Sequence, residues 1–158
     1  GDDTNFAILT HLKDKISQIN PKAGERIFVF RGYRDQFAYA VQLASDFYLM
    51  PCRFEPCGLT QLISLRYGTV PIVRETGGLK DTVVPYNEYE KTGTGFTFAH
   101  YNADDLLYTI NYAKKIYFDH REDWNDILCR GMEQDFSWGS SALQYQGMYD
   151  WILRGMQD

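Results

Sequence analysis

Cysteine, long apolar runs and clustered basic charge are all scarce in this sequence. Its three cysteines, Cys52, Cys57 and Cys129, form an odd set with no paired spacing and no histidine nearby, so neither a structural disulfide nor a metal site is expected. No apolar stretch approaches the ~20 residues of a membrane-spanning helix, and the first three residues do not begin a signal peptide. We therefore expect a cytoplasmic chain, or an excised piece of one, with no membrane contact.

The charge balance excludes one class of partner. Lys and Arg total 16 against 21 Asp and Glu, the net charge is −5, and the basic residues are scattered along the chain. Proteins that bind a polyanionic backbone carry a clustered basic surface, so nucleic acid is not an expected partner. The hydrophobic content of 44% and the length of 158 residues instead indicate one compact globular domain over residues 1–158.

The pattern of apolar residues indicates an α/β fold. Spacings of three and four residues predict helices at residues 4–19, 36–44, 58–67, 103–118, 122–132 and 140–153, the last within a C-terminal helical segment 136–158. Short β-branched and aromatic runs, bounded by glycine or proline, predict strands at residues 26–30, 46–50, 70–73 and 95–99. The polar residues 75–94 are expected to form a long loop. This alternation predicts a parallel sheet with helices on both faces.

The loops that follow the predicted strands are the candidate binding sites, because ligands of open α/β sheets lie beyond the carboxyl ends of the strands. After Met50 come a carboxylate, Glu55, and a glycine, Gly58, just before a predicted helix. The free N–H groups of a helix N-terminus suit a phosphate or a sugar hydroxyl. Glu55 and Pro56 also fit a purely structural role, in which they favour the helix dipole and form the first turn.

Two other loops also fit either a ligand-binding role or a purely structural one. Adjacent glycines, Gly77 and Gly78, follow the strand that ends at Val73 and fit either a phosphate-facing turn or a turn alone. Tyr33 follows the strand predicted to end at Phe30, where its ring could stack on a nucleobase or simply pack.

Several segments together carry a family resemblance. Residues 53–61 read Arg-Phe-Glu-Pro-Cys-Gly-Leu-Thr-Gln, and the pattern continues through residues 66–74 and 76–83, with shorter matches at residues 32–33, 93–96 and 135–138. In these segments the chain resembles the C-terminal half of bacterial glycogen synthases and plant starch synthases. The resemblance implies a retaining glycosyltransferase of the two-Rossmann-domain (GT-B) type, which transfers glucose from ADP-glucose to the non-reducing end of an α-1,4-glucan. It implies no cofactor and no metal.

The same resemblance suggests a role for individual residues. Glu55 resembles the motif carboxylate that contacts the hydroxyls of the donor glucose, and it is the candidate catalytic residue. The implied ADP-glucose-binding residues are the base-stacking Tyr33, Thr60 near the phosphate or ribose, the amides around Cys57, Gly58 and Leu59, and Gly77 and Gly78 beside the donor sugar. A carboxylate that accepts two hydroxyl hydrogen bonds, and amides that stabilise the departing diphosphate, agree with this assignment.

The chain also departs from the family pattern. Other transferases of this architecture often have a second glutamate eight residues after the first. Ile63 stands at that position here, as an apolar residue commonly does in the bacterial synthases, and Cys52 stands where serine is usual. The basic residues that clamp the donor phosphates would precede Gly1, and the glucan acceptor would bind mainly to a missing N-terminal domain. We therefore expect an N-terminally truncated donor domain that lacks its first strands, exposes a sheet edge and has no transferase activity alone.

Two alternatives remain open from the sequence. The chain could be a stand-alone carbohydrate-binding or nucleotide-binding module whose aromatic residues stack on glucan. It could also belong to another retaining GT-B hexosyltransferase, such as a sucrose-forming enzyme.

Overall fold

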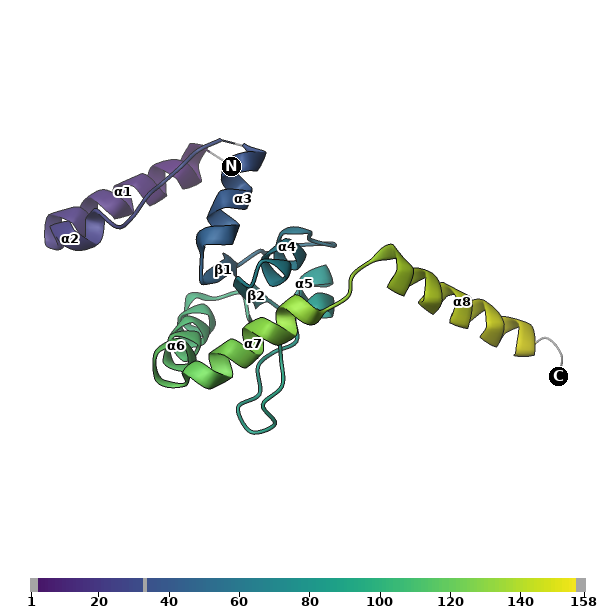
Figure 1. Ribbon diagram of the computed structural model, residues 1–158. Coiled ribbons are helices and arrows are strands. Elements are labelled where there is room, and N and C mark those ends of the chain that lie inside the picture. Colours follow the sequence, from purple (N-terminus) through teal and green to yellow (C-terminus); the bar gives the residue numbers. More distant parts are fainter. Residues whose placement is uncertain (1–2, 33, 156–158) are drawn as a thin grey trace. The chain divides into compact units, whose positions relative to one another are not determined.

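The computed structural model describes residues 3–32 and 34–155 (Figure 1). The chain divides into two compact units, Gly1–Tyr39 and Ala40–Asp158. None of the described helices is both long and apolar enough to span a membrane.

The first unit contains α1 (Asp3–Ile19), α2 (Pro21–Gly24) and the beginning of α3 (Asp35–Ala44). The short α2 begins after Asn20, whose side chain accepts a hydrogen bond from the Ala23 amide at 3.2 Å, and proline occupies its first turn. The helices predicted at residues 4–19 and 36–44 are confirmed within one residue.

The strand predicted at residues 26–30 is wrong. No described strand pairs with these residues, whose last part instead forms an irregular segment with Phe28 and Phe30 largely exposed. The ring of Phe37 lies 4.8 Å from that of Phe30 and 6.4 Å from that of Phe28, so this small cluster is stabilised by ring contacts. A β-branched and aromatic run forms a strand only where a neighbouring strand completes its hydrogen-bond ladder.

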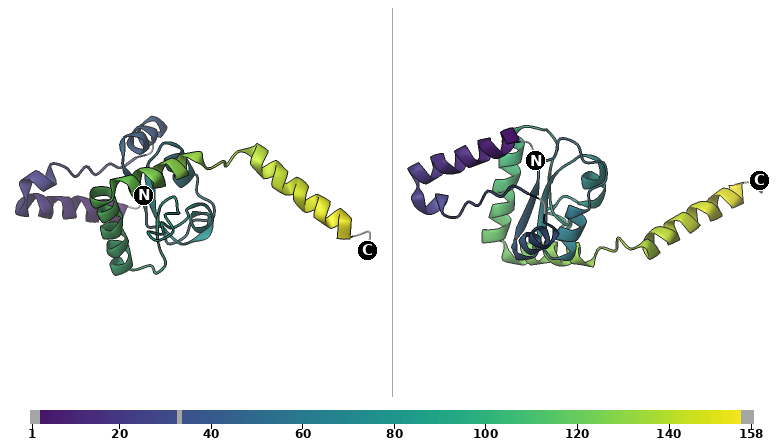
Figure 2. Two further views of the ribbon diagram at one scale, coloured as in Figure 1. Left: turned by 60° about the horizontal axis from the view of Figure 1, so that its bottom comes forward. Right: turned by 90° about the horizontal axis from the view of Figure 1, so that it is seen from above.

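The second unit is built on a three-stranded parallel sheet (Figure 2). Its strands are β1 (Phe47–Met50), β2 (Val70–Arg74) and β3 (Phe96–Phe98), in the order β1-β2-β3, which confirms three of the predicted strands and their parallel pairing. Met50 lies opposite Val73 across the first pair. Because the strands are parallel, the loops that follow all three begin at the same edge of the sheet.

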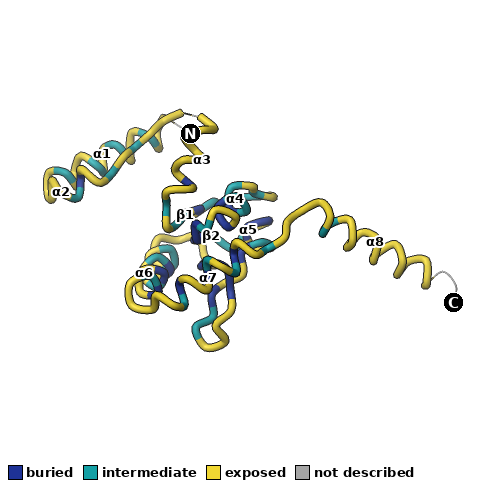
Figure 3. The backbone as a smooth tube through the Cα atoms, in the orientation of Figure 1, coloured by how far each residue is buried: buried dark blue, intermediate teal, exposed yellow. Residues whose placement is uncertain are grey.

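Each face of the sheet buries its own apolar cluster. Figure 3 shows the buried positions of the strands and helices in dark blue. On one face, Ile72 and Phe96 pack with residues of α6 (Ala103–Asp119) and α7 (Arg121–Glu133), including the fully buried Trp124. On the other face, Met50 and Val73 pack with Leu79 and Val83. Alternate side chains of a strand point to opposite faces, so a short apolar run serves both clusters.

The loop predicted at residues 75–94 contains a helix. Residues Gly77–Thr82 form α5, since Leu79 and the following Val83 gain burial against the sheet, and this outweighs the low helix propensity of two glycines. The rest of the segment is a turn, closed by an isolated bridge between Asn87 and Thr92.

The remaining helices are α4 (Thr60–Arg66) and α8 (Trp138–Gly155). The helix predicted at residues 58–67 is shorter than expected because it begins at Thr60. Ser137 caps α8 by accepting a hydrogen bond from the Ser140 amide at 3.3 Å, and no described residue of α8 is buried.

Candidate functional site

The loop between β1 and α4 presents polar groups at the carboxyl edge of the sheet. Glu55 is half-buried, whereas Cys57 and Leu59 are exposed. Gly58 adopts φ +73°, a left-handed conformation that favours glycine and turns the chain into α4. The amides of residues 57–59 make no hydrogen bond to any other residue that the structure describes, so their donors are free for a ligand.

The Gly77–Gly78 turn, which is the beginning of α5, lies directly against this loop. A Cβ added at Gly77 would overlap the carbonyl oxygen of Glu55, and one at Gly78 would overlap that of Cys57. The Gly78 amide donates a hydrogen bond to the Pro56 carbonyl at 3.3 Å. Glycine is therefore required at both positions for the close approach of two backbone segments.

A side chain from the end of β2 makes a further link to the first loop. The Arg74 guanidinium donates a hydrogen bond through Nη1 to the Arg53 carbonyl at 2.8 Å and lies over the ring of Tyr101. The structure thus brings together seven of the eight residues predicted for the site, which are Glu55, Cys57, Gly58, Leu59, Thr60, Gly77 and Gly78. The eighth, Tyr33, lies outside the described residues.

The carboxylate of Glu55 influences its neighbour. Burial raises the pKa of the Cys52 thiol, and the negative charge of Glu55 raises it further, so Cys52 is held in its protonated form at neutral pH. Glu55 has no ion-pair partner among residues 3–32 and 34–155, which leaves both carboxylate oxygens available as acceptors. No described group of His, Cys, Asp and Glu residues could hold a metal ion.

Thr60 begins α4, and its hydroxyl is already engaged. Its Oγ1 donates to the sulfur of Met50 at 3.4 Å, and its carbonyl accepts from Nε2 of Gln42 at 3.3 Å. These contacts attach the first turn of α4 to β1 and α3. Thr60 is therefore held in place at the edge of the site, and the resemblance alone suggests that it contacts the donor.

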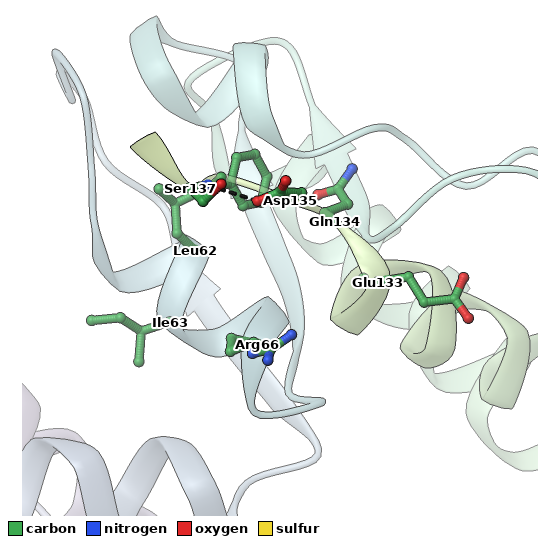
Figure 4. Close-up of a pocket in the computed structure, with 9 residues that line it drawn as sticks. Leu62, Ile63, Arg66, Glu133, Gln134, Asp135 and Ser137 are labelled. Carbon is green, nitrogen blue, oxygen red and sulfur yellow. Dashed lines mark hydrogen bonds between the residues drawn. The ribbon is translucent and has the colours of Figure 1, made fainter. Parts of the chain in front are cut away.

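A cavity of about 540 Å³ is lined by Leu62, Ile63 and Arg66 of α4 and by the end of α7 with the segment that follows it, and Leu62 lies next to Ser137 (Figure 4). In that segment the Ser137 amide donates to Oδ1 of Asp135 at 2.9 Å, and hydrogen bonds from Ser137 lower the pKa of the Asp135 carboxyl. None of the residues predicted to bind the donor lines this cavity. The predicted site is instead a surface formed by two adjoining loops.

Sequence reasoning missed two residues that organise this surface. Nε2 of Gln61 in α4 donates a hydrogen bond to Oγ1 of Thr82 in α5 at 3.2 Å and so joins the two helices that follow the site loops. Gln61 lies within residues 53–61, which carry the family resemblance. The feature that distinguishes it, its complete burial, is visible only in the structure.

Comparison with known proteins agrees with this fold and these motifs. A family model described as "Glycosyl transferases group 1" matches residues 11–127. The glycogen synthase of Lachnospira eligens is 57% identical over 129 residues, which are 82% of this chain and 27% of that protein. The glycogen synthase of Lachnoclostridium phytofermentans is 51% identical over 153 residues, covering 94% of this chain and 32% of that protein. The chain therefore spans about a third or less of the length of these relatives.

Solved structures give the same result for the fold. The catalytic domain of starch synthase IV from Arabidopsis thaliana, solved with ADP and acarbose, superposes with a TM-score of 0.71 at 34% identity, covering 89% of this chain and 30% of that one. Sucrose-phosphate synthase from Thermosynechococcus elongatus, at 22% identity and a TM-score of 0.57, shares the fold. These likenesses confirm the predicted Rossmann-like sheet of a GT-B enzyme. Since the family model covers well over half of its residues, this chain belongs to the glycosyl transferase group 1 family.

Proposed function

We propose that this chain forms the donor-binding part of a glycogen or starch synthase, which transfers glucose from ADP-glucose to the non-reducing end of an α-1,4-glucan with retention. The observation that carries the proposal is the junction of the Glu55 loop with the Gly77–Gly78 turn, in a chain 57% identical to a glycogen synthase over 129 residues. ADP in the starch synthase IV structure supports an adenine nucleotide as the donor carrier.

In the proposed reaction, the bond between the glucose C1 and the diphosphate breaks, and a bond forms from C1 to the acceptor oxygen. Glu55 would accept hydrogen bonds from the glucose hydroxyls and hold the sugar for attack. The free amides of residues 57–59 would stabilise the negative charge that develops on the departing diphosphate, which takes up the acceptor proton. Tyr33 would stack on adenine, and neither a metal nor a cofactor takes part.

The whole enzyme needs more than this chain. Retaining transfer requires donor and acceptor to be enclosed together with water excluded, and the glucan would bind mainly through a second domain. The chain alone should therefore bind nucleotide and lack transferase activity, and the enzyme would act in the cytoplasm.

Calorimetry and a transfer assay test this proposal. Titration of the 158-residue chain with ADP, ADP-glucose and maltooligosaccharides should give heat for the two nucleotides. The whole enzyme should transfer labelled glucose from ADP-glucose to glycogen, and the isolated chain should not. Binding of maltooligosaccharide with no response to either nucleotide would favour a stand-alone glucan-binding module, and a whole enzyme that cannot use ADP-glucose would contradict the proposal.

A further inference from the structure

The side chain of Gln61 is buried between the two loops of the site. It is 0% exposed and comes from the first turn of α4. Its Nε2 donates to the carbonyls of Cys57 at 3.2 Å and Gly58 at 3.0 Å, and to Oγ1 of Thr82 at 3.2 Å. Three acceptors around one amide group determine which end of the side chain carries the nitrogen.

Thr82 extends this connection to the second loop. Its hydroxyl donates to the Gly78 carbonyl at 2.6 Å and therefore accepts the hydrogen bond from Gln61. A continuous chain of hydrogen bonds thus runs from the Cys57 and Gly58 carbonyls, through Gln61 and Thr82, to the Gly78 carbonyl. It reinforces the direct bond from the Gly78 amide to Pro56.

The other end of the amide shows that Gln61 does more than fill space. Its Oε1 lies beside Gly58, where an added Cβ would overlap it, and accepts no hydrogen bond from the residues that the structure describes. Burial of a polar group without a partner is unfavourable, so packing alone would be served better by an apolar side chain. The favourable half of the exchange is the set of hydrogen bonds that the two N–H bonds of Nε2 share among three acceptors.

Ser64 provides the contrast on the same helix. It is equally buried, but its hydroxyl donates to the Thr60 carbonyl within α4 at 2.8 Å and makes no hydrogen bond to residues 57–59 or 77–78 of the described chain. Gln61 therefore acts on the loop geometry, and Ser64 acts on the helix.

We propose that Gln61 is a positioning residue that, through Thr82, holds residues 57–59 and the Gly77–Gly78 turn as one rigid unit, so that the free amides of the first loop and the glycine turn face the donor together. This inference rests on the proposed function, because the bound group it serves is the sugar diphosphate. Its structural part, the coupling of two loops, holds for any ligand of this surface.

Steady-state kinetics of the whole enzyme test the positioning role. Gln61→Met keeps a side chain of similar length and removes the donors, and it should lower kcat for ADP-glucose by about 10²-fold, the cost of a misplacement near 1 Å. The KM for glycogen should stay at the wild-type value, since the glucan is proposed to bind mainly through the second domain. Thr82→Val should also lower kcat. Thr82→Ser, which keeps the hydroxyl, should have the wild-type kcat.

Ser64→Ala is the matched control for lost stability. It removes a buried hydrogen bond from the same helix and should leave kcat unchanged. If Gln61→Met lowers kcat no more than Ser64→Ala does, the positioning role is contradicted while the proposed function stands. Should Gln61→Met fail to fold, Thr82→Val and Thr82→Ser carry the same comparison with a smaller change in the core.

Amide hydrogen exchange on the 158-residue chain tests the coupling without a substrate. In Gln61→Met and in Thr82→Val, the Gly78 amide, which donates to the Pro56 carbonyl, should exchange faster, together with the Ile63 amide, which donates to the Leu59 carbonyl. The two substitutions combined should add little more. Independent, additive changes in the two loops would overturn the coupling even if the enzyme uses ADP-glucose. Coupled exchange in a chain whose whole enzyme rejects ADP-glucose would instead contradict only the proposed function.

Discussion

Glu55 illustrates how a single side chain acquires a role from its surroundings. Its carboxylate sits at the carboxyl edge of β1, half-buried and without an ion-pair partner in the described part of the chain. A carboxylate in this position can accept two hydrogen bonds from a sugar at once. The purely structural role, in which Glu55 only favours the helix dipole, would leave catalysis unchanged when the carboxylate is removed.

Glu55→Ala should lower kcat of the whole enzyme by at least about 10²-fold, because hydrogen bonds to the glucose hydroxyls strengthen toward the transition state. Initial rates of labelled glucose transfer measure this. Glu90→Ala, which removes an exposed carboxylate from the turn at residues 87–92, serves as the control and should leave the rate unchanged. A rise in KM with a normal kcat would show that Glu55 contributes uniform binding instead.

Tyr112 packs on the face of the sheet that α6 and α7 cover. Its ring packs edge-on against Phe96 at 5.6 Å and stacks near Tyr86. Burial, with a smaller contribution from the negative charge of Glu88, raises the pKa of its phenol from 10.0 to about 12. The folded state therefore favours the neutral phenol.

The free energy of unfolding should decrease between pH 10 and pH 12, because the unfolded tyrosine loses its proton first while the folded one keeps it. This contribution is complete below pH 10 and is lost as the pH rises through 12. Urea unfolding of Tyr112→Phe should show a weaker decrease over this range than the wild type. Tyr145→Phe, on the exposed surface of α8, should follow the wild-type curve, and identical curves for all three proteins would contradict the assignment.

At the scale of elements, the docking of α7 depends on one aromatic side chain. Trp124 is 1% exposed, and its ring lies 4.7 Å from that of Phe47 in β1 and 4.9 Å from that of Tyr117 in α6. One residue thus joins a strand and two helices. Trp151 in α8 is 75% exposed and provides a matched comparison.

Trp124→Ala should lower the free energy of unfolding by about 3–5 kcal/mol, since it leaves a large cavity among three elements. Trp151→Ala should change it by no more than about 0.5 kcal/mol. Urea unfolding followed by circular dichroism measures both values. Equal losses in the two variants would mean that α8 is packed as firmly as α7.

The success of the sequence predictions also varies by element. Long amphipathic helices such as α6 and α7 follow from periodicity, because one stripe of apolar residues suffices to specify them. Residues 26–30 have strand propensity, but propensity does not supply the partner that a strand requires. For α5 the sequence predicted a loop where the structure has a helix. Burial of Leu79 stabilises this helix although its two glycines disfavour it.

At the scale of the whole molecule, β1 and β3 are the two edge strands of the described sheet. Among the described strands β1 pairs only with β2, and its Leu49 is 45% exposed. An edge strand with apolar side chains is a template for pairing with a second chain. The exposed sheet edge expected from the sequence is therefore present in the part of the chain that the structure describes.

The 158-residue chain should self-associate in a concentration-dependent manner, and Leu49→Lys should weaken the association by placing charge on the exposed edge. Sedimentation velocity over a range of concentrations measures the effect. Leu143→Lys, at an exposed position of α8, should have a smaller effect. Association that persists in Leu49→Lys and disappears in Leu143→Lys would assign the contact to α8.

The sequence by itself determined the parallel α/β architecture, because apolar periodicity is a local property of the chain. Local patterns also indicated Glu55, Gly58, Gly77 and Gly78 as candidates in the loops after two predicted strands, and the family resemblance added Cys57, Leu59 and Thr60. Only the tertiary structure decided how those loops are joined. Gln61 and Thr82 are separated by 21 positions, and their hydrogen bond exists because β1 and β2 lie side by side and bring the two loops to one edge. Such a contact depends on the register of two strands, which no local pattern specifies.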